Sequence, residues 1–296
     1  MSPTRPTSLA PQASDGQRVG AHTAIAGVIG DPVRHSLSPV LHNAAFRHLG
    51  LDWIYVAFAV SAQDAPAALR GAVALGVRGL SVTMPHKQAA ARSCDQRSAV
   101  VERLGAANTV VVRSGVALAH STDGAGLLDD LAAALGFDAA GRSCAVLGAG
   151  GAARAVVLAL AEAGASSVVV VNRTASRAES AAELAGRIGR SGTVGDLADA
   201  DLVVNAAPAE AAGLDAGTTA GAGLGSGQIA YDMRYAPATS RFLAEAAASG
   251  ATVRNGLGML VHQAALQFAL WTGETAPIET LWSAARGALG DVAPVG

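Results

Sequence analysis

Short apolar runs alternate along the chain with stretches whose apolar residues recur at helical spacing. The runs are rich in Val, Ile and Ala, which predicts buried strands. They read IAGVIG (25–30), WIYVAFAV (53–60), GLSVT (79–83), SCAVL (143–147), SSVVVV (166–171), DLVVNAA (201–207) and QIAYDM (228–233). Alternating strands and helices predict an α/β fold whose parallel sheets are covered by helices on both faces.

The segment SPVLHNAAFRHLG (38–50) carries start and stop signals of a helix. Ser38 stands where an N-cap is expected, Pro39 at the first helical position, and Gly50 just past the end. We expect a helix over most of this segment.

The pattern changes at NTVVVRSGVALAH (108–120), which predicts two strands around a short Ser-Gly turn. This hairpin and the STDG that follows it indicate a boundary near residue 123. We therefore expect two α/β domains around a cleft, the second a Rossmann-type, doubly wound parallel sheet. Residues 1–20 are polar and rich in Pro, Ser and Gly, and we expect a disordered tail there.

Composition excludes several classes of protein. Hydrophobic residues make up 51% and aromatic residues 4%, which suits helices packed on a valine-rich sheet. The formal charge of −2 provides no basic face for nucleic acid and no polybasic membrane patch. No apolar run approaches the roughly 20 residues of a membrane helix. Two cysteines, Cys94 and Cys144, do not make a disulfide framework, so we expect a cytoplasmic protein. No metal-binding spacing of histidines is present, and we expect no metal.

A glycine-rich turn joins a strand to a helix in AVLGAGGAARAVV (145–157). Gly148, Gly150 and Ala153 form a G-x-G-x-x-A pattern, in which the glycines let a pyrophosphate approach backbone N–H groups at the helix N-terminus. Glycines also serve plain turns, but the strand and helix on either side favour dinucleotide binding.

The next strand distinguishes between cofactors. An NAD site places Asp or Glu at its end, about 20 residues beyond the glycines. This chain has Asn172 there, followed by Arg173, Thr174 and, one helical turn on, Arg177. The two guanidiniums could be ordinary solvated charges, but cations oppose the macrodipole at a helix N-terminus unless an anion binds there. The segment therefore favours NADP.

Lys87 is the only lysine among 21 Lys and Arg residues, and it follows a strand end and Pro85. Ligands in open α/β sheets bind at the carboxyl ends of strands, where Asp123 is also expected. A lysine can release and regain a proton, whereas arginine stays protonated. Lys87 and Asp123 could form a general acid/base pair; a plain surface ion pair and a Schiff-base lysine are the alternatives.

The HSLSP segment (34–39 region) contributes Ser36 and Ser38. Two hydroxyls at a helix N-terminus make a neutral receptor for a carboxylate. The alternative for Ser38 is an N-cap alone.

Together these segments resemble the shikimate dehydrogenase family, from about residue 24 onward. The motifs occur in the family's order and approximate spacing: HSLSP, VTMPHK, AANTVV, STDG, GAGGAAR, NRTASR, YDMRYAPATSRFL and NGLGMLVHQAALQFALWTG. The resemblance implies reversible, NADPH-dependent reduction of 3-dehydroshikimate to shikimate, a step of aromatic amino-acid biosynthesis. It also implies that helices from about residue 258 return to the first domain. The expected division is 21–123 plus 258–296 for the substrate and 124–257 for NADP, in a monomer or homodimer.

The resemblance further implies roles for individual residues. Lys87 would be the acid/base, paired with Asp123, and Ser36 and Ser38 would hold the substrate carboxylate. The ring hydroxyls would be bound by Thr83, Asn108, Asp123, Tyr235 and Gln263. The cofactor would be bound by Gly148, Ala149, Gly150, Gly151 and Ala152 at the pyrophosphate, Asn172, Arg173, Thr174 and Arg177 at the 2′-phosphate, and Met233 and Gly256 at the nicotinamide.

Four positions depart from the family pattern. Ala207 and Glu210 replace a usual Thr and Gly, Asn255 stands where Asp is common, and Arg234 precedes the substrate tyrosine where an apolar residue is usual. These departures keep three alternatives open: a quinate/shikimate dehydrogenase, a paralogue acting on another hydroxylated ring acid, and a non-catalytic NADP(H)-binding regulator.

Overall fold

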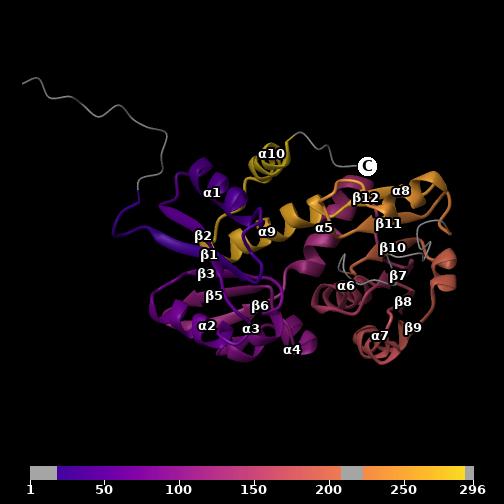
Figure 1. Cartoon of the computed structure of the whole chain (residues 1–296), viewed down its shortest axis with the longest axis horizontal. Helices are drawn as coiled ribbons and strands as arrows, with labels where there is room; N and C mark the ends of the chain where they lie inside the picture. The colour runs from indigo at the N-terminus through magenta and orange to yellow at the C-terminus, as the bar shows by residue number, and fades with distance from the viewer. Residues whose placement is uncertain (1–18, 208–222, 291–296) are drawn as a thin grey trace, which may run out of the picture.

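Two six-stranded sheets, with two long helices between them, make up the computed structural model, which describes residues 19–207 and 223–290 (Figure 1). The first sheet is drawn in indigo and purple, and the second in rose and orange. Almost all of the predicted N-terminal tail lies outside the described residues.

The first sheet has the strand order β2-β1-β3-β5-β6-β4. Parallel pairs join β1 to β2 and to β3, whereas β5 runs antiparallel to both β3 and β6. The expectation of parallel sheets is therefore wrong for this part of the chain, because the hairpin turns the sheet into a mixed one. The strands are β1 (Ala24–Gly30), β2 (Trp53–Ala59), β3 (Gly79–Val82), β4 (Gln96–Arg97), β5 (Thr109–Arg113) and β6 (Val116–His120).

The hairpin itself is confirmed. Arg113 pairs with Val116 across a two-residue turn, and both turn residues have positive φ, 50° at Ser114 and 78° at Gly115. Such a turn matches the right-handed twist of the strands that it joins.

The second sheet is parallel throughout, with the order β12-β11-β10-β7-β8-β9. The chain starts in the centre and winds outward in both directions, which is the doubly wound Rossmann order. Ligands bind such sheets beyond the carboxyl ends of the two central strands, here β7 and β10. The strands are β7 (Ser143–Leu147), β8 (Ser167–Val171), β9 (Gly189–Ser191), β10 (Leu202–Asn205), β11 (Ile229–Asp232) and β12 (Thr252–Asn255).

Helices cover both faces of each sheet, and the buried side chains form separate cores on the two faces. No helix in the described ranges is long and apolar enough to cross a membrane. The α-helices are α1 (Ser38–His48), α2 (Ala65–Ala74), α3 (Lys87–Ser93), α4 (Ala99–Leu104), α5 (Asp123–Leu135), α6 (Gly151–Glu162), α7 (Ala175–Ala182), α8 (Arg241–Ala248), α9 (Leu257–Thr272) and α10 (Ile278–Leu289).

The start of α1 corrects one prediction. Leu37 is the N-cap and no side chain caps the helix, so Ser38 lies inside the first turn. Its hydroxyl lies 3.2 Å from that of Ser36 instead. Gly50 follows the helix with a φ of 64°, as its stop-signal role predicts.

Helices α5 and α9 lie side by side between the two sheets (Figure 1). Glycine permits the close approach: a Cβ on Gly126 would lie 2.7 Å from the backbone nitrogen of Gln263. Met259, near the start of α9, packs in a core of the second sheet, whereas Phe268 and Trp271 pack in a core of the first. The helix α9 therefore ties the two halves together.

A buried ion pair fixes α5 to the second sheet. Arg254 Nε donates to Asp130 Oδ2 at 2.8 Å, and the side chains are 7% and 0% exposed. The Tyr231 hydroxyl donates to the same carboxylate at 2.8 Å and accepts from the backbone N–H of Met259 at 3.2 Å. One carboxylate thus connects α5, β11, β12 and the first turn of α9.

Candidate active site

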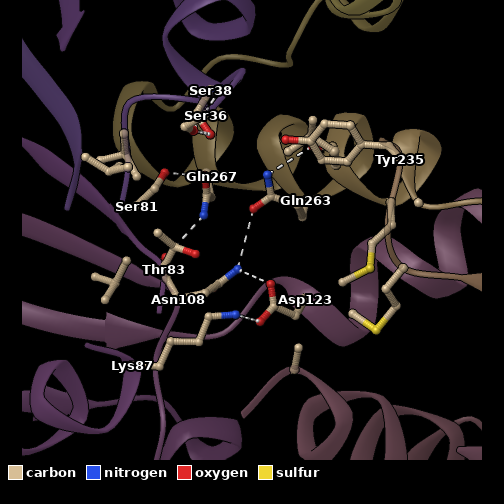
Figure 2. A pocket seen from close by; sticks show the side chains of 18 of the residues that line it. Ser36, Ser38, Ser81, Thr83, Lys87, Asn108, Asp123, Tyr235, Gln263 and Gln267 are labelled. Carbon is tan, nitrogen blue, oxygen red and sulfur yellow. Dashed lines mark hydrogen bonds and ion pairs between the residues drawn. The ribbon is translucent and has the colours of Figure 1, made fainter. Parts of the chain in front are cut away.

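A cavity of about 240 Å³ lies where the two halves meet. The ends of β1, β3 and β6 and the start of the antiparallel β5 reach the same edge of the first sheet, and α6, β11 and β12 face that edge from the other half. The structure brings together there the side chains that the sequence assigned to substrate: Ser36, Ser38, Thr83, Lys87, Asn108, Asp123, Tyr235 and Gln263. Figure 2 shows them arranged around the cavity.

Lys87 and Asp123 form an ion pair inside this cavity (Figure 2). Lys87 Nζ lies 2.6 Å from Asp123 Oδ2, and the side chains are 17% and 10% exposed. Lys87 is the first residue of α3 and Asp123 the first residue of α5. The short distance lets a proton move between amine and carboxylate, or from the amine to a ligand beside it.

Asn108 holds the Asp123 carboxylate from the other side. Its Nδ2 donates to Asp123 Oδ1 at 2.8 Å and to the Thr122 hydroxyl at 2.9 Å. Its Oδ1 accepts from the Thr122 backbone N–H and the Thr109 hydroxyl, both at 2.8 Å. Since Asn108 is buried and bonded at both ends, the amide can adopt only one orientation and fixes the carboxylate.

Uncharged hydroxyls and amides line the far end of the cavity. Ser36 and Ser38 lie there, with Ser38 6% exposed. Behind them the Tyr55 hydroxyl donates to Ser81 at 2.6 Å, and Ser81 donates to Gln267 Oε1 at 2.7 Å. Burial raises the pKa of Tyr55, so the phenol stays protonated and can donate. This end suits a carboxylate that needs hydrogen-bond donors.

Ser81 and Gln267 line the cavity and were not predicted from the sequence. Ser81 lies inside the strand segment 79–83, where its neighbours are apolar. Gln267 follows Gln263 by four residues, and such a pair shares one face of a helix. That spacing was the available signal for Gln267.

Tyr235 and Gln263 lie on the side of the cavity nearest the second sheet (Figure 2). Gln263 Nε2 donates to Leu260 O at 3.0 Å within its own helix, while its Oε1 lies 3.5 Å from Asn108 Nδ2. Burial raises the pKa of Tyr235. Both groups can therefore bond to a hydroxylated ligand.

The glycine-rich turn leaves room above the N-terminus of α6. Gly148 has a φ of 107°, which disfavours any residue with a Cβ. Gly150 is the N-cap, and a Cβ there would meet no atom within 4 Å. Ala149 lies between these two glycines, and Ala152, in the first turn of α6, lines the cavity. Open space over free backbone N–H groups fits a pyrophosphate.

The basic segment after β8 lies at the surface. Asn172 Nδ2 donates to Thr174 O at 3.0 Å and orders the turn, and Thr174 is the N-cap of α7. Arg173, Thr174 and Arg177 are all exposed. Two guanidiniums and a hydroxyl at one helix start fit a 2′-phosphate.

Met233 and Gly256 follow β11 and β12 and line the cavity. A Cβ on Gly256 would overlap the carbonyl group of Met233, so no other residue fits without movement. The dinucleotide-binding features and the Lys87–Asp123 pair thus open onto one cavity.

The departures from the family pattern leave this cavity intact. Arg234 pairs with the buried Asp232, with 2.9 Å between Nη2 and Oδ2, and does not line the cavity. Asn255 bonds to the Ala238 carbonyl and, at 3.2 Å, to the backbone N–H of Leu257 at the start of α9. The Ala207 N–H bonds to Asn205 Oδ1 at 3.2 Å. Glu210 lies outside the described residues.

A Rossmann-type half facing a second half that carries an acid/base pair defines a nicotinamide-dependent oxidoreductase. Family models match three stretches: the shikimate dehydrogenase substrate binding domain at residues 28–110, the shikimate/quinate 5-dehydrogenase at 130–219, and the shikimate 5′-dehydrogenase C-terminal domain at 256–286. The chain belongs to the shikimate dehydrogenase family.

Individual relatives agree with this assignment. The shikimate dehydrogenase (NADP⁺) of Methanopyrus kandleri is 43% identical over 89% of this chain and 95% of its own. The shikimate 5-dehydrogenase of Thermus thermophilus, solved with NADP(H) and shikimate, has a TM-score of 0.81 and 38% identity over 90% of this chain and 99% of its own. A shikimate dehydrogenase solved with NADP⁺ has a TM-score of 0.85 and 33% identity over 93% and 99% of the two chains.

Proposed function

We propose that this chain catalyses the reversible, NADPH-dependent reduction of 3-dehydroshikimate to shikimate. One observation carries the proposal: a single cavity joins the Lys87–Asp123 pair to an uncharged carboxylate receptor and to the end of a dinucleotide site. The curated relatives are named for this reaction with NADP⁺. We further propose that the protein works in the cytoplasm.

The substrate would be held at both ends of its ring. Ser36 and Ser38 would donate hydrogen bonds to the carboxylate. The ring hydroxyls would bond to the opposite wall and the floor of the cavity, that is to Thr83, Asn108, Asp123, Tyr235 and Gln263. These contacts fix the orientation of the carbonyl group that is reduced, and fixed orientation lowers the barrier of the chemical step.

Lys87 would act as general acid in reduction and general base in oxidation. Bound NADPH supplies the hydride to the carbonyl carbon. Lys87 Nζ donates a proton to the oxygen as negative charge develops on it, and Asp123 Oδ2 keeps the amine directed at that oxygen. Asn108 holds the other carboxylate oxygen and so prevents Asp123 from turning away.

The cofactor would lie across the carboxyl ends of β7 and β10. Gly148 to Ala152 would bind the pyrophosphate, Asn172 to Arg177 the 2′-phosphate, and Met233 and Gly256 the nicotinamide end. The proposed substrate half is 21–123 with 258–296, and the proposed cofactor half is 124–257. The strands of the two sheets fall on the two sides of this division.

The test is the rate of NADP⁺ reduction by the purified protein with shikimate, run beside quinate and repeated with NAD⁺. We expect fast turnover only with shikimate and NADP⁺, because an added ring hydroxyl beside the carboxylate would crowd Ser36 and Ser38. Equal rates with quinate would favour a quinate/shikimate dehydrogenase. Tight NADPH binding without turnover of either acid would contradict the proposal and favour the paralogue or the regulator.

A further inference from the structure

The side chain of Lys87 lies against the glycine-rich turn of the other half of the molecule. A Cβ built on Gly151 would lie 3.6 Å from Cδ and 3.9 Å from Cβ of Lys87, which is ordinary van der Waals distance. The hydrocarbon stem of the amine therefore contacts the first residue of α6, while its Nζ bonds to Asp123. The turn forms one wall of the acid/base site.

We propose that Gly151 is a positioning residue for Lys87: the bare backbone of the nucleotide turn supports the stem so that Nζ reaches Asp123, and a dinucleotide on the turn encloses the amine. This inference rests on the proposed function, because it assumes that the turn binds a pyrophosphate and that Lys87 is the acid/base. It adds a direct contact between the two sites.

Each glycine of the turn has a different reason for lacking a side chain. Gly148 needs its positive φ, and Gly150 opens onto empty space. Gly151 has an ordinary φ, and the nearest atoms to its missing side chain belong to Lys87. A branched side chain extends a further bond length from Cβ, so it would overlap the Lys87 stem and push it away from Asp123.

The composition of the chain makes this contact measurable. Lys87 is the only lysine, so an amine reagent modifies no side chain but this one. An arginine-specific protease releases it in the peptide 79–92, separate from the N-terminal amine. The rate of modification by trinitrobenzenesulfonate, followed on this peptide by mass spectrometry, reports how well the amine is enclosed, independently of turnover.

The experiment compares the wild type with Gly151→Val and, as a matched control, Gly150→Val. Both valines crowd the pyrophosphate-binding turn, but only the one at 151 meets Lys87. Without nucleotide, we expect Gly151→Val to raise the rate of modification several-fold and Gly150→Val to leave it at the wild-type value. Equal rates in the two variants would overturn the proposal.

A second arm needs no variant and therefore stands even if Gly151→Val fails to fold. The ligand 2′-phospho-ADP-ribose carries the pyrophosphate but no nicotinamide, and at saturation it should slow modification of wild-type Lys87 several-fold. Unchanged modification would overturn the proposal. The proposed function would survive that result if shikimate and NADP⁺ still turn over and Lys87→Ala abolishes the reaction.

Discussion

Asp123 is a buried carboxylate at the first residue of a helix, and its surroundings stabilise its charge. The positive end of the α5 macrodipole favours an anion at this position. The Lys87 amine and the Asn108 amide then bond to one oxygen each. An arginine at position 87 could bind the carboxylate, but it stays protonated and could not exchange a proton with substrate.

His42 is fully buried beside the carboxylate end of the cavity, yet neither ring nitrogen has a hydrogen-bond partner. The ring stacks on Tyr55 at 4.5 Å between centroids and lies 5.0 Å from Trp271. Burial lowers its pKa from 6.5 to about 3, and the amide of Gln267 opposes part of that shift. The histidine therefore stays neutral and keeps this end of the cavity free of a fixed positive charge.

We expect the neutral state of His42 to make the protein less stable in acid. Between pH 6.5 and about 3 the unfolded chain binds one proton more at this residue than the folded chain. The free energy of unfolding should therefore fall with decreasing pH in this range, by about 1.4 kcal/mol per unit from His42 alone. His42→Phe keeps a ring and removes the titration, so urea unfolding at pH 7, 6 and 5 should show a shallower decline. Parallel declines in the two proteins would contradict this explanation.

Individual residues were predictable where a motif gave them a chemical reason. The lone lysine, the acid of STDG and the serines of HSLSP were selected from the sequence, and they line one cavity; their roles remain predictions. Ser81 and His42 lie inside ordinary strand and helix patterns. Their position beside the cavity depends on packing between segments far apart in the chain, which periodicity does not encode.

Among the elements, the long and strongly patterned ones were predicted from the sequence and the short ones were not. The hairpin, α1 and the valine-rich strands follow from propensity and turn residues. The strands β4 and β9 have two and three residues, too few to show a pattern. The N-cap at Ser38 failed because the preceding chain enters the helix one residue earlier, at Leu37.

The start of α7 carries the predicted cofactor preference. If Arg177 contacts the 2′-phosphate, Arg177→Ser should remove a charge-assisted hydrogen bond of about 1.5–3 kcal/mol and weaken NADP⁺ binding roughly ten- to a hundredfold. NAD⁺ lacks this phosphate, so its KM should not change. Arg187→Ser, an exposed arginine elsewhere in the same half, is the control. An equal effect on both cofactors would place the phosphate elsewhere.

The Asp130–Arg254 pair is expected to be a strong attachment of α5 to the second sheet. Arg254→Met leaves a buried carboxylate without its cation, which should cost about 3–5 kcal/mol in the free energy of unfolding. Arg241→Met removes the exposed i,i+4 pair with Glu245 and should cost about 0.5 kcal/mol or less. Urea unfolding of both variants checks the difference, and similar losses would show that burial adds nothing to this pair.

At the scale of the whole molecule, the site exists only because the two halves face each other. The first sheet provides the carboxylate receptor and the acid/base pair, and the second provides the nucleotide turn, Met233 and Gly256. Helices α5 and α9 hold the halves together, and α9 packs in a core of each. The sequence predicted two α/β domains around a cleft, but not that the first sheet would be mixed.

The central claim is that Lys87 transfers the proton in an NADP-linked oxidation of shikimate. The most direct test is the turnover of Lys87→Ala with saturating shikimate and NADP⁺, measured together with NADPH binding. We predict a loss in kcat of about 10²–10⁴-fold, the usual contribution of a general acid/base, with NADPH affinity nearly unchanged. Turnover within about tenfold of the wild type would contradict the account, because the amine would then not carry the proton.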